Sequence, residues 1–437
     1  MHEFEAGGTS ENRSIPHLRY WIVGLVFFAT VINYLDRQTL SVVAPLLRDE
    51  FRMSNTEYSY AVFAFMLAYT IMNGVSGRVI DLLGSRRGFI LIMIWWSAAA
   101  MAHSLVAGVF GLALCRLLLG AGEAGNWPAG VKVVAEWFPL RERAFASGIF
   151  NSGSAVGAVI APPLVAAITA RWGWRAAFLM VGSVGLAWLL VWMRVYQLPA
   201  QHGRISRAEL DHITEGGRQD ARESGPKPGF WRLFSRRFVW ALTLSKIFLD
   251  PVWYFYIFWF PEYLKRVRGF DLAQIGMYGW IPFLTADVGN LLGGWMSGRL
   301  IRMGWSVNTA RKGTITLFAA LMTAAIPAVL TSNVWLALAL VSCATMGYTG
   351  CNANILALPS DVFPRNSVST VFGIASMGSG FGGMLFTLTT GIVVDHFSYR
   401  PIFFAAGVMP IICALLLWTL VGRIAPMSRE ELLGHLD

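Results

Sequence analysis

Charged side chains are scarce in this chain of 437 residues: they make up 14% of it, whereas hydrophobic residues make up 55%. Soluble globular proteins typically carry about 25% charged residues. The mean hydropathy of the chain is correspondingly high, at +0.54. Because so few polar side chains cannot cover the surface of a water-exposed protein of this size, the composition excludes an ordinary soluble enzyme or binding module.

Clusters of metal-binding or redox-active residues are also missing from the sequence. The seven histidines are scattered along the chain, and the cysteines lie in apolar stretches without paired spacing, at Cys115, Cys343, Cys351 and Cys413. We therefore expect no disulfide framework, no metal site and no cofactor. Without a catalytic cluster of this kind, we also expect that the protein is not an enzyme.

Acidic residues are fewer than basic ones, 25 against 35, which leaves a formal net charge of +10. A basic balance can indicate nucleic-acid binding. If the N-terminus is cytoplasmic, however, the expected cytoplasmic segments hold 22 Lys and Arg residues and the segments on the other side hold 8. This asymmetry follows the positive-inside rule, with both termini cytoplasmic. The positive charge thus indicates orientation in a membrane, and we expect no nucleic-acid partner.

Long apolar runs are abundant, and each is close to the 20 or so residues that a membrane-spanning helix needs. Lipid offers no partner to backbone polar groups, so these runs are expected to be helices. The first run is too long for the core of a signal peptide, and we expect it to remain in the mature protein. The twelve expected spans are 20–43, 58–80, 88–110, 111–135, 144–169, 175–197, 238–263, 273–298, 313–331, 334–358, 367–394 and 400–422.

One long polar connection separates the first six spans from the last six. We therefore expect an N-terminal tail, a six-helix bundle, a cytoplasmic linker, a second six-helix bundle and a C-terminal tail, at residues 1–19, 20–197, 198–237, 238–423 and 424–437. The halves share residues at an offset of 225: Gly148, Gly153 and Gly157 match Gly373, Gly378 and Gly382. This pattern predicts two parallel repeats with a substrate site between them near the middle of the membrane.

Ionisable side chains within spans are costly and usually mark a transport pathway. Arg116 and Glu123 lie seven residues apart, which places them on one face of a helix roughly 10 Å apart along its axis. They either form a structural ion pair, or Arg116 attracts a substrate carboxylate while Glu123 carries a proton. Other ionisable residues within the expected spans include Asp36, Arg37, Lys246, Asp250 and Asp287.

Arg37 keeps its positive charge and therefore needs a carboxylate partner, which a sugar acid can supply in bidentate geometry. Its neighbour Asp36 is either a proton carrier or a group near the outer interface. Lys246 and Asp250 are four residues apart and could satisfy each other. Alternatively, Lys246 binds the anion while Trp253 and Tyr254 line the cavity. Asn352, Asn354 and Asn290 are candidate partners for sugar hydroxyls, or else they bond between helices.

The loop after the second span reads Gly77-Arg-Val-Ile-Asp81-Leu-Leu-Gly84-Ser-Arg86-Arg87. Gly84 permits a tight turn, and Asp81 can pair with basic residues or cap a neighbouring helix. The loop resembles the signature loop of the major facilitator superfamily, although its residues also fit an ordinary basic loop. The second half has Gly298 where the motif has Asp, which suggests a weaker second gate contact.

Three further stretches narrow the resemblance: Val31-Ile-Asn-Tyr-Leu-Asp36-Arg37, Cys115–Pro128 and Glu136–Arg143. Together they are similar to the anion:cation symporter branch, and to its hexuronate transporters in particular. The resemblance implies proton carriers at Asp36 and Glu123 and substrate contacts at Arg37, Tyr69 and Arg116. We add Lys246, Trp253, Tyr254 and Asn352 to the substrate site. Gating or structural roles are expected for Gly77, Asp81, Gly84, Arg86, Arg87, Arg141, Arg143, Asp361 and Arg365.

The expected protein is thus an all-α membrane protein with twelve transmembrane helices in two pseudo-symmetric bundles. The resemblance implies a monomer in the cell (inner) membrane that carries a hexuronate anion inward with protons by alternating access. Its partners would be the organic anion, protons and the lipid bilayer. The alternatives are a symporter of another organic anion, such as an aldonate, dicarboxylate or aromatic acid, and a membrane nutrient sensor that does not transport.

Overall fold

The structure is a computed structural model that describes residues 14–214, 230–363 and 365–425, and every regular element in those ranges is helical. Within them, eight helices are long and apolar enough to cross a membrane. The prediction of an all-α membrane protein is therefore confirmed. Each of the twelve expected spans falls mainly on helix, and some of them are divided between two shorter helices.

Residues 14–195, all of which the structure describes, contain six α-helices and a short 3-10 turn, η1. Their bounds are α1 Leu18–Phe51, α2 Asn55–Ala102, η1 His103–Leu105, α3 Val109–Glu123, α4 Asn126–Trp137, α5 Leu140–Trp172 and α6 Trp174–Val195. Helix α2 contains the expected span 58–80 and most of the expected span 88–110, which are joined at Gly84 (φ 76°, ψ 160°). By contrast, the single expected span 111–135 is divided between two helices, α3 and α4.

The second half is also helical, and some of its expected spans are likewise divided between two helices. Its helices are α8 Phe230–Phe234, α9 Arg237–Arg268, α10 Leu272–Tyr278, α11 Ile281–Arg302, α12 Val307–Met322, α13 Ala325–Leu330, α14 Val334–Val362, α15 Arg365–His396 and α16 Arg400–Leu420. Across both halves, several helices begin with a side-chain cap. Ser54 and Glu57 form a capping box at α2, as Asp271 and Gln274 do at α10. These caps satisfy amide groups that the first turn of a helix leaves free.

Part of the linker lies against the start of α1. The described segment includes the 3-10 turn η2 (Pro199–Gln201). The carboxylate of Glu209 accepts hydrogen bonds from the backbone amides of Leu18 and Arg19, at 3.0 and 3.2 Å. The first turn of α1 contains no acidic residue of its own. Glu209 therefore supplies the negative charge that stabilises this helix N-terminus.

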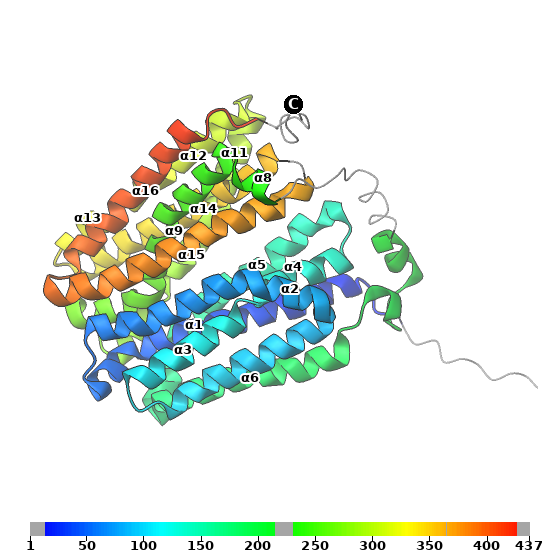
Figure 1. The fold of residues 1–437 in the computed structure, drawn as a ribbon. Helices are drawn as coiled ribbons and strands as arrows, with labels where there is room; N and C mark the ends of the chain where they lie inside the picture. The colour runs from blue at the N-terminus through cyan, green and yellow to red at the C-terminus, as the bar shows by residue number, and fades with distance from the viewer. Residues whose placement is uncertain (1–13, 215–229, 364, 426–437) are drawn as a thin grey trace, which may run out of the picture.

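The two halves form two bundles that lie side by side (Figure 1). The repeat seen in the sequence is also present in the packing. A Cβ atom on Gly153 or Gly157 of α5 would collide with the backbone of α1, and one on Gly378 or Gly382 of α15 would collide with the backbone of α9 in the same way. The matched glycines thus let matched helix pairs approach closely.

The bundles are joined at the end where α1 and α9 finish and α2 begins, which we call the closed end. There Arg48 pairs with Glu262, and Asp49 pairs with Lys265 (2.6 Å) and Arg266. Asp395 of α15 accepts hydrogen bonds from the first residues of α2. Between described residues, all side-chain hydrogen bonds and ion pairs that join the bundles lie in this half of the molecule.

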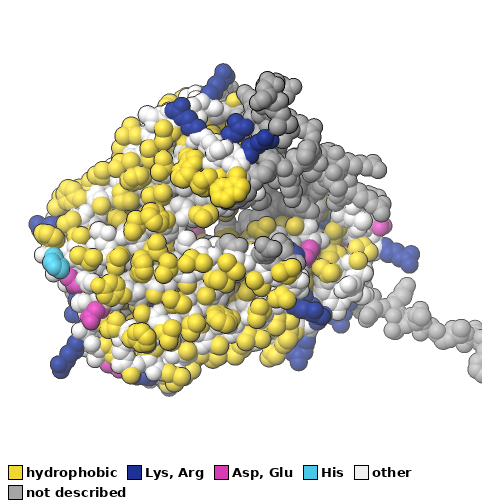
Figure 2. Space-filling view, in the orientation of Figure 1, with side chains coloured by type: hydrophobic (Ala, Val, Ile, Leu, Met, Phe, Trp, Pro, Cys, Tyr) yellow, Lys and Arg dark blue, Asp and Glu magenta, His cyan; other side chains and the backbone are white. Residues whose placement is uncertain are grey.

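The outer surface of the bundles is apolar over most of its length. Figure 2 shows hydrophobic side chains across the middle of the visible face, with Lys, Arg, Asp and Glu gathered toward its edges. Large apolar side chains such as Phe110 and Leu291 are mostly exposed, at 83% and 74%. Exposed apolar area of this extent is unfavourable in water and suits contact with lipid tails.

Candidate functional site

Four ionisable side chains meet inside the first bundle, two from α1 and two from α3. Asp36, Arg37, Arg116 and Glu123 are all at most 3% exposed. We refer to them as the charge cluster. Two carboxylates and two guanidinium groups would balance if all were ionised. Burial of so many charges is expensive, which makes a functional purpose more plausible than a structural one.

The guanidinium of Arg37 is held by Glu123. Its Nε and Nη2 atoms donate to Oε2 of Glu123 at 3.1 and 3.0 Å, and Nη2 also donates to Asn33 at 3.3 Å. The group lies 4.7 Å from the ring centroid of Tyr69 and 5.0 Å from that of Tyr34. Glu123 therefore pairs across helices with Arg37. The ion pair within one helix, between Arg116 and Glu123, is not formed.

Arg116 is fully buried, yet none of its three guanidinium nitrogens has a hydrogen-bond partner among the described residues. The group lies over the ring of Phe65, 4.5 Å from its centroid, and 5.9 Å from that of Phe258. Phe258 belongs to α9, so Arg116 faces the interface between the bundles. An unpaired cation at such a place is costly, and a carboxylate ligand would satisfy it.

The carboxyl groups of the cluster also keep free acceptor atoms. Oδ2 of Asp36 and Oε1 of Glu123 are buried without a hydrogen-bond partner among the described residues. Asp36 lies within electrostatic range of Glu123 and Arg116. A proton on either carboxyl would reduce repulsion between the two acids. Each of the two acids thus keeps one carboxyl oxygen that no described residue occupies.

A second polar group lies on the facing side, in α9 and α14. Nζ of Lys246 is 2.8 Å from Oδ2 of Asp250, and Tyr348 donates to Oδ1 of the same carboxylate at 3.1 Å. The pairing of Lys246 with Asp250, one of the two alternatives from the sequence, is the one observed. Asn352 lies beside this pair, with its Oδ1 atom 3.5 Å from Nζ of Lys246.

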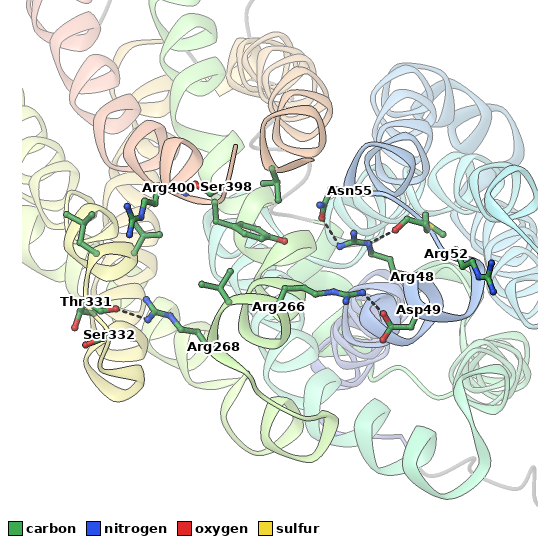
Figure 3. Close-up of a pocket in the computed structure, with 16 residues that line it drawn as sticks. Arg48, Asp49, Arg52, Asn55, Arg266, Arg268, Thr331, Ser332, Ser398 and Arg400 are labelled. Atoms are coloured by element: carbon green, nitrogen blue, oxygen red, sulfur yellow. Dashed lines mark hydrogen bonds and ion pairs between the residues drawn. The ribbon is translucent and has the colours of Figure 1, made fainter. Parts of the chain in front are cut away.

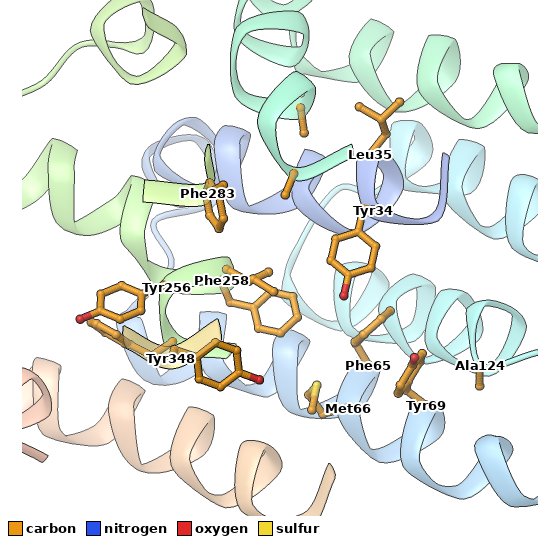
Figure 4. Packing of buried hydrophobic residues seen from close by; sticks show 14 of the residues in the cluster. Tyr34, Leu35, Phe65, Met66, Tyr69, Ala124, Tyr256, Phe258, Phe283 and Tyr348 are labelled. Carbon is orange, nitrogen blue, oxygen red and sulfur yellow. The ribbon is translucent and has the colours of Figure 1, made fainter. Parts of the chain in front are cut away.

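Aromatic side chains connect the two polar groups. In Figure 4 the hydroxyls of Tyr34 and Tyr348, from opposite bundles, point toward the same interior region near Phe65 and Phe258. Trp253 stacks on Tyr348 with ring centroids 5.0 Å apart. Tyr254 lies within electrostatic range of Arg37 and Tyr69, and its hydroxyl is 3.4 Å from that of Ser379. The interface thus offers flat apolar faces together with hydroxyl groups.

The structure places other predicted residues away from this interface. Asn354 donates to the carbonyls of Gly293 and Gly350 at 3.0 Å and accepts from Arg311, so it bonds between helices. Asp361 accepts from Nε of Arg311 at 2.8 Å. Arg311 was counted only among the 22 basic residues of the expected cytoplasmic segments, so its role in holding three helices together was missed.

In the signature loop, Gly84 has the positive φ that a tight turn requires, and Arg86 donates to the carbonyl of Met193 at 2.7 Å. Arg87 is exposed. A Cβ atom on Gly77 would lie 3.8 Å from Pro128, which is ordinary contact. The side chains of Asp81, Arg141, Arg143 and Arg365 fall outside the described residues.

Sequence reasoning also missed residues at the candidate site and at the closed end. Tyr34 and Asn33 lie within the stretch that ends at Asp36 and Arg37, so their position could have drawn attention to them. Glu262 lies inside the expected span 238–263 and is a buried carboxylate, which is the signal that marks other functional groups. Tyr348 carries no such signal, because a tyrosine in an apolar run is usual.

Comparison with known proteins agrees with this arrangement. The family profile described as Major Facilitator Superfamily matches residues 26–371 and 303–433. The sequence is 34% identical over 413 residues to the hexuronate transporter of Escherichia coli (strain K12), covering 94% of this chain and 95% of that protein. It is 36% identical over 313 residues to the galacturonate transporter of Dickeya chrysanthemi, covering 70% and 90%.

The fold is similar to that of a bacterial homologue of the human lysosomal transporter Spinster, solved in an inward-facing and occupied conformation. The TM-score is 0.74 at 21% identity, with 93% of this chain and 97% of that chain covered. Such a likeness concerns the fold alone. Because the family profile spans most of the chain and the relatives exceed 30% identity over much of it, the protein belongs to the major facilitator superfamily of membrane transporters.

Proposed function

We propose that this protein is a proton-coupled symporter that brings a hexuronate anion, such as glucuronate or galacturonate, into the cell. The observation that carries the proposal is Arg116, a fully buried guanidinium without a hydrogen-bond partner among the described residues, which faces the interface between the bundles. The relatives named for hexuronate and galacturonate transport support this substrate class.

Arg116 would bind the carboxylate of the sugar acid through two parallel hydrogen bonds. Tyr69, Trp253 and Tyr254 would lie against the apolar faces of the sugar ring. Asn352 and Lys246 would bind its hydroxyl groups from the second bundle. This arrangement suits a ligand that has a charged group at one end and a ring with hydroxyl groups and apolar faces at the other.

Protons would be coupled to the anion through Glu123 and Asp36. In this structure the carboxylate of Glu123 forms an ion pair with the guanidinium of Arg37. A proton on Glu123 would weaken that ion pair and leave Arg37 available to the substrate carboxylate. Proton binding and anion binding would therefore favour each other. An inside-negative potential opposes anion entry by roughly 2.3 kcal/mol per charge per 100 mV, and one proton per monoanion removes this opposition.

Transport would proceed by rocking of the two bundles, residues 20–197 and 238–423, about the central site. In the proposed orientation both termini are cytoplasmic, and the protein acts as a monomer in the inner membrane. The closed end then faces outward. The gating groups expected at the opposite end are Gly77, Asp81, Gly84, Arg86, Arg87, Arg141, Arg143, Asp361 and Arg365.

Calorimetric titration of the purified protein would test the substrate site. We expect glucuronate and galacturonate to bind and neutral glucose not to bind. Arg116→Gln should weaken uronate binding at least about tenfold, since hydrogen bonds to charged groups contribute roughly 1.5–3 kcal/mol. Arg302→Gln, an exposed arginine at the opposite end from the closed end, is the matched control. Folded protein that binds another anion class and no uronate would overturn the substrate assignment.

A further inference from the structure

A cavity of about 900 Å³ opens at the closed end, where the two bundles meet. It is separate from the charge cluster, and its lining comes from α1, α2, α9, the α13–α14 connection and the α15–α16 connection (Figure 3). Its charges are almost all of one sign. The ionisable residues that line it are five arginines and a single carboxylate: Arg48, Arg52, Arg266, Arg268, Arg400 and Asp49. We call this cavity the basic vestibule.

Two of these arginines form ion pairs with carboxylates of the closed end. Arg48 pairs with Glu262, and Arg266 pairs with both Glu262 (3.0 Å) and Asp49. Figure 3 shows Arg266 reaching toward Asp49. These ion pairs hold the bundles together. Glu262 and Asp49 therefore offset much of the charge of Arg48 and Arg266, and we do not assign the attraction of a ligand to these two arginines.

The other three arginines are not balanced. Arg268 donates to the hydroxyl of Tyr263 and to the carbonyls of Thr331 and Ala328, at 2.6–2.7 Å, and all of these acceptors are neutral. Arg52 and Arg400 are exposed and form no ion pair with any described residue. A concave surface with uncompensated positive charge concentrates anions from solution.

The internal repeat provides a comparison for Arg400. Its counterpart in the first half, at an offset of 225, is Arg175, which forms an ion pair with Glu50 at 3.0 Å. The position therefore allows an arginine to be neutralised by a neighbour. In the second half the arginine lines the vestibule without such a neighbour among the described residues, which leaves its charge available to a ligand.

We propose that the basic vestibule is a low-affinity entry site for organic carboxylates. It would collect the anion on the outer face while the closed end still blocks the path to the charge cluster. Its volume lies within the range of small-molecule sites. The hydroxyl-bearing residues Thr331, Ser332 and Ser398 also line it, and they suit a hydroxylated acid. This inference rests on the orientation and the substrate class of the proposed function.

The test compares Arg52→Gln/Arg400→Gln with Arg171→Gln, an exposed arginine of the closed end that does not line the vestibule. Initial rates of glucuronate uptake are measured in phosphatidylcholine liposomes at low and high salt. The double variant should lower kcat/KM at low salt by about tenfold through loss of electrostatic attraction, with kcat unchanged. The difference should vanish at high salt, because salt screens exposed charges. An unchanged kcat/KM at low salt would overturn the proposal.

The same comparison in liposomes that contain anionic lipid separates two sources of negative charge. If the double variant differs from the wild type only there, the arginines bind lipid headgroups, and the carboxylate proposal is overturned. A loss that persists at high salt would also overturn it, since that result indicates a structural effect.

A binding measurement separates this inference from the proposed function. Arg116→Gln should lose the central site and retain weak, salt-sensitive glucuronate binding, detected by calorimetry. Adding Arg52→Gln/Arg400→Gln should abolish that residual binding. If the wild type shows no uptake and the residual binding is present, only the proposed function fails. If Arg116→Gln binds no glucuronate at low salt, the vestibule proposal fails whatever the uptake result.

Discussion

At the scale of single residues, the two arginines of the charge cluster differ in their partners. Arg37 is held by Glu123 and Asn33, whereas Arg116 is equally buried and has no hydrogen-bond partner among the described residues. A partner that is missing from the protein can be supplied by a ligand. This difference divides the expected roles: Arg116 is ready for the anion, and Arg37 becomes available only when Glu123 releases it.

Replacing Glu123 with Gln should uncouple transport from protons. The amide keeps the size of the side chain but can neither carry the charge nor exchange a proton. We expect gradient-driven uptake of glucuronate to be lost, while exchange of labelled for unlabelled glucuronate across the membrane is retained. Both are measured in proteoliposomes. Gradient-driven uptake at the wild-type rate would show that Glu123 is not the coupling group.

Asp36→Asn tests the second carboxyl of the cluster. If both acids carry protons in each cycle, uptake of a monoanion moves net positive charge, and an inside-negative potential accelerates it. The Asn variant should then lose this acceleration by the potential. The measurement is uptake at a fixed pH gradient with and without a potassium diffusion potential set by valinomycin. An unchanged response to the potential would exclude Asp36 as a second proton carrier.

At the scale of helices, the matched glycines decide how closely α1 approaches α5 and how closely α9 approaches α15. Residues of α1 and α9 near the candidate site lie along these contacts. For example, Tyr34 is the neighbour that a Cβ atom on Gly157 would meet, and Pro251 is one that a Cβ atom on Gly382 would meet. The same contacts therefore affect both helix packing and the position of the candidate site.

Gly378→Ala should destabilise the second bundle, because the new Cβ atom would lie 2.6 Å from the carbonyl oxygen of Thr243. Overpacking of this kind typically costs about 1–3 kcal/mol. A Cβ atom on Gly373 of the same helix meets nothing within 4 Å, so Gly373→Ala is the control. Thermal unfolding in detergent should give a lower midpoint for the first variant only. Equal midpoints would mean that α15 and α9 can move apart to accept the methyl group with little loss of free energy of unfolding.

At the scale of the whole molecule, the bundles are held together by polar contacts at one end. Arg48, Glu262 and Asp49 contribute ion pairs, and Asp395 binds the start of α2 from the other bundle. The proposed rocking of the bundles would break such contacts in each cycle. Their combined free energy would then bias the equilibrium between the two conformations of that cycle.

Weakening these contacts with Glu262→Gln/Asp395→Asn should increase the population that is open at the closed end. Spin labels at Trp172 and Phe397, which are exposed on opposite bundles at this end, would report the distance in a background without native cysteines. Longer distances should become more populated. The same pair of labels with Asp211→Asn, in the linker, is the control. An unchanged distance distribution would contradict a gating role for the closed end.

The sequence predicted the helical class and identified the residues of the charge cluster, because apolar length, spacing and charge within apolar runs are local features. It did not predict which charges pair. Arg37 and Glu123 are 86 residues apart, and their contact depends on how α1 and α3 are rotated toward each other. The closed end and the basic vestibule depend on the conformation adopted by two bundles, which helical periodicity along one segment does not describe.

Uptake of radiolabelled glucuronate into proteoliposomes is the direct test of proton-coupled hexuronate symport. With an inward proton gradient, we expect uptake well above that of protein-free liposomes, and its collapse when a protonophore is added. Arg302→Gln should behave like the wild type. A preparation that binds glucuronate but accumulates none under the gradient, or whose accumulation is indifferent to the protonophore, would contradict proton-coupled symport.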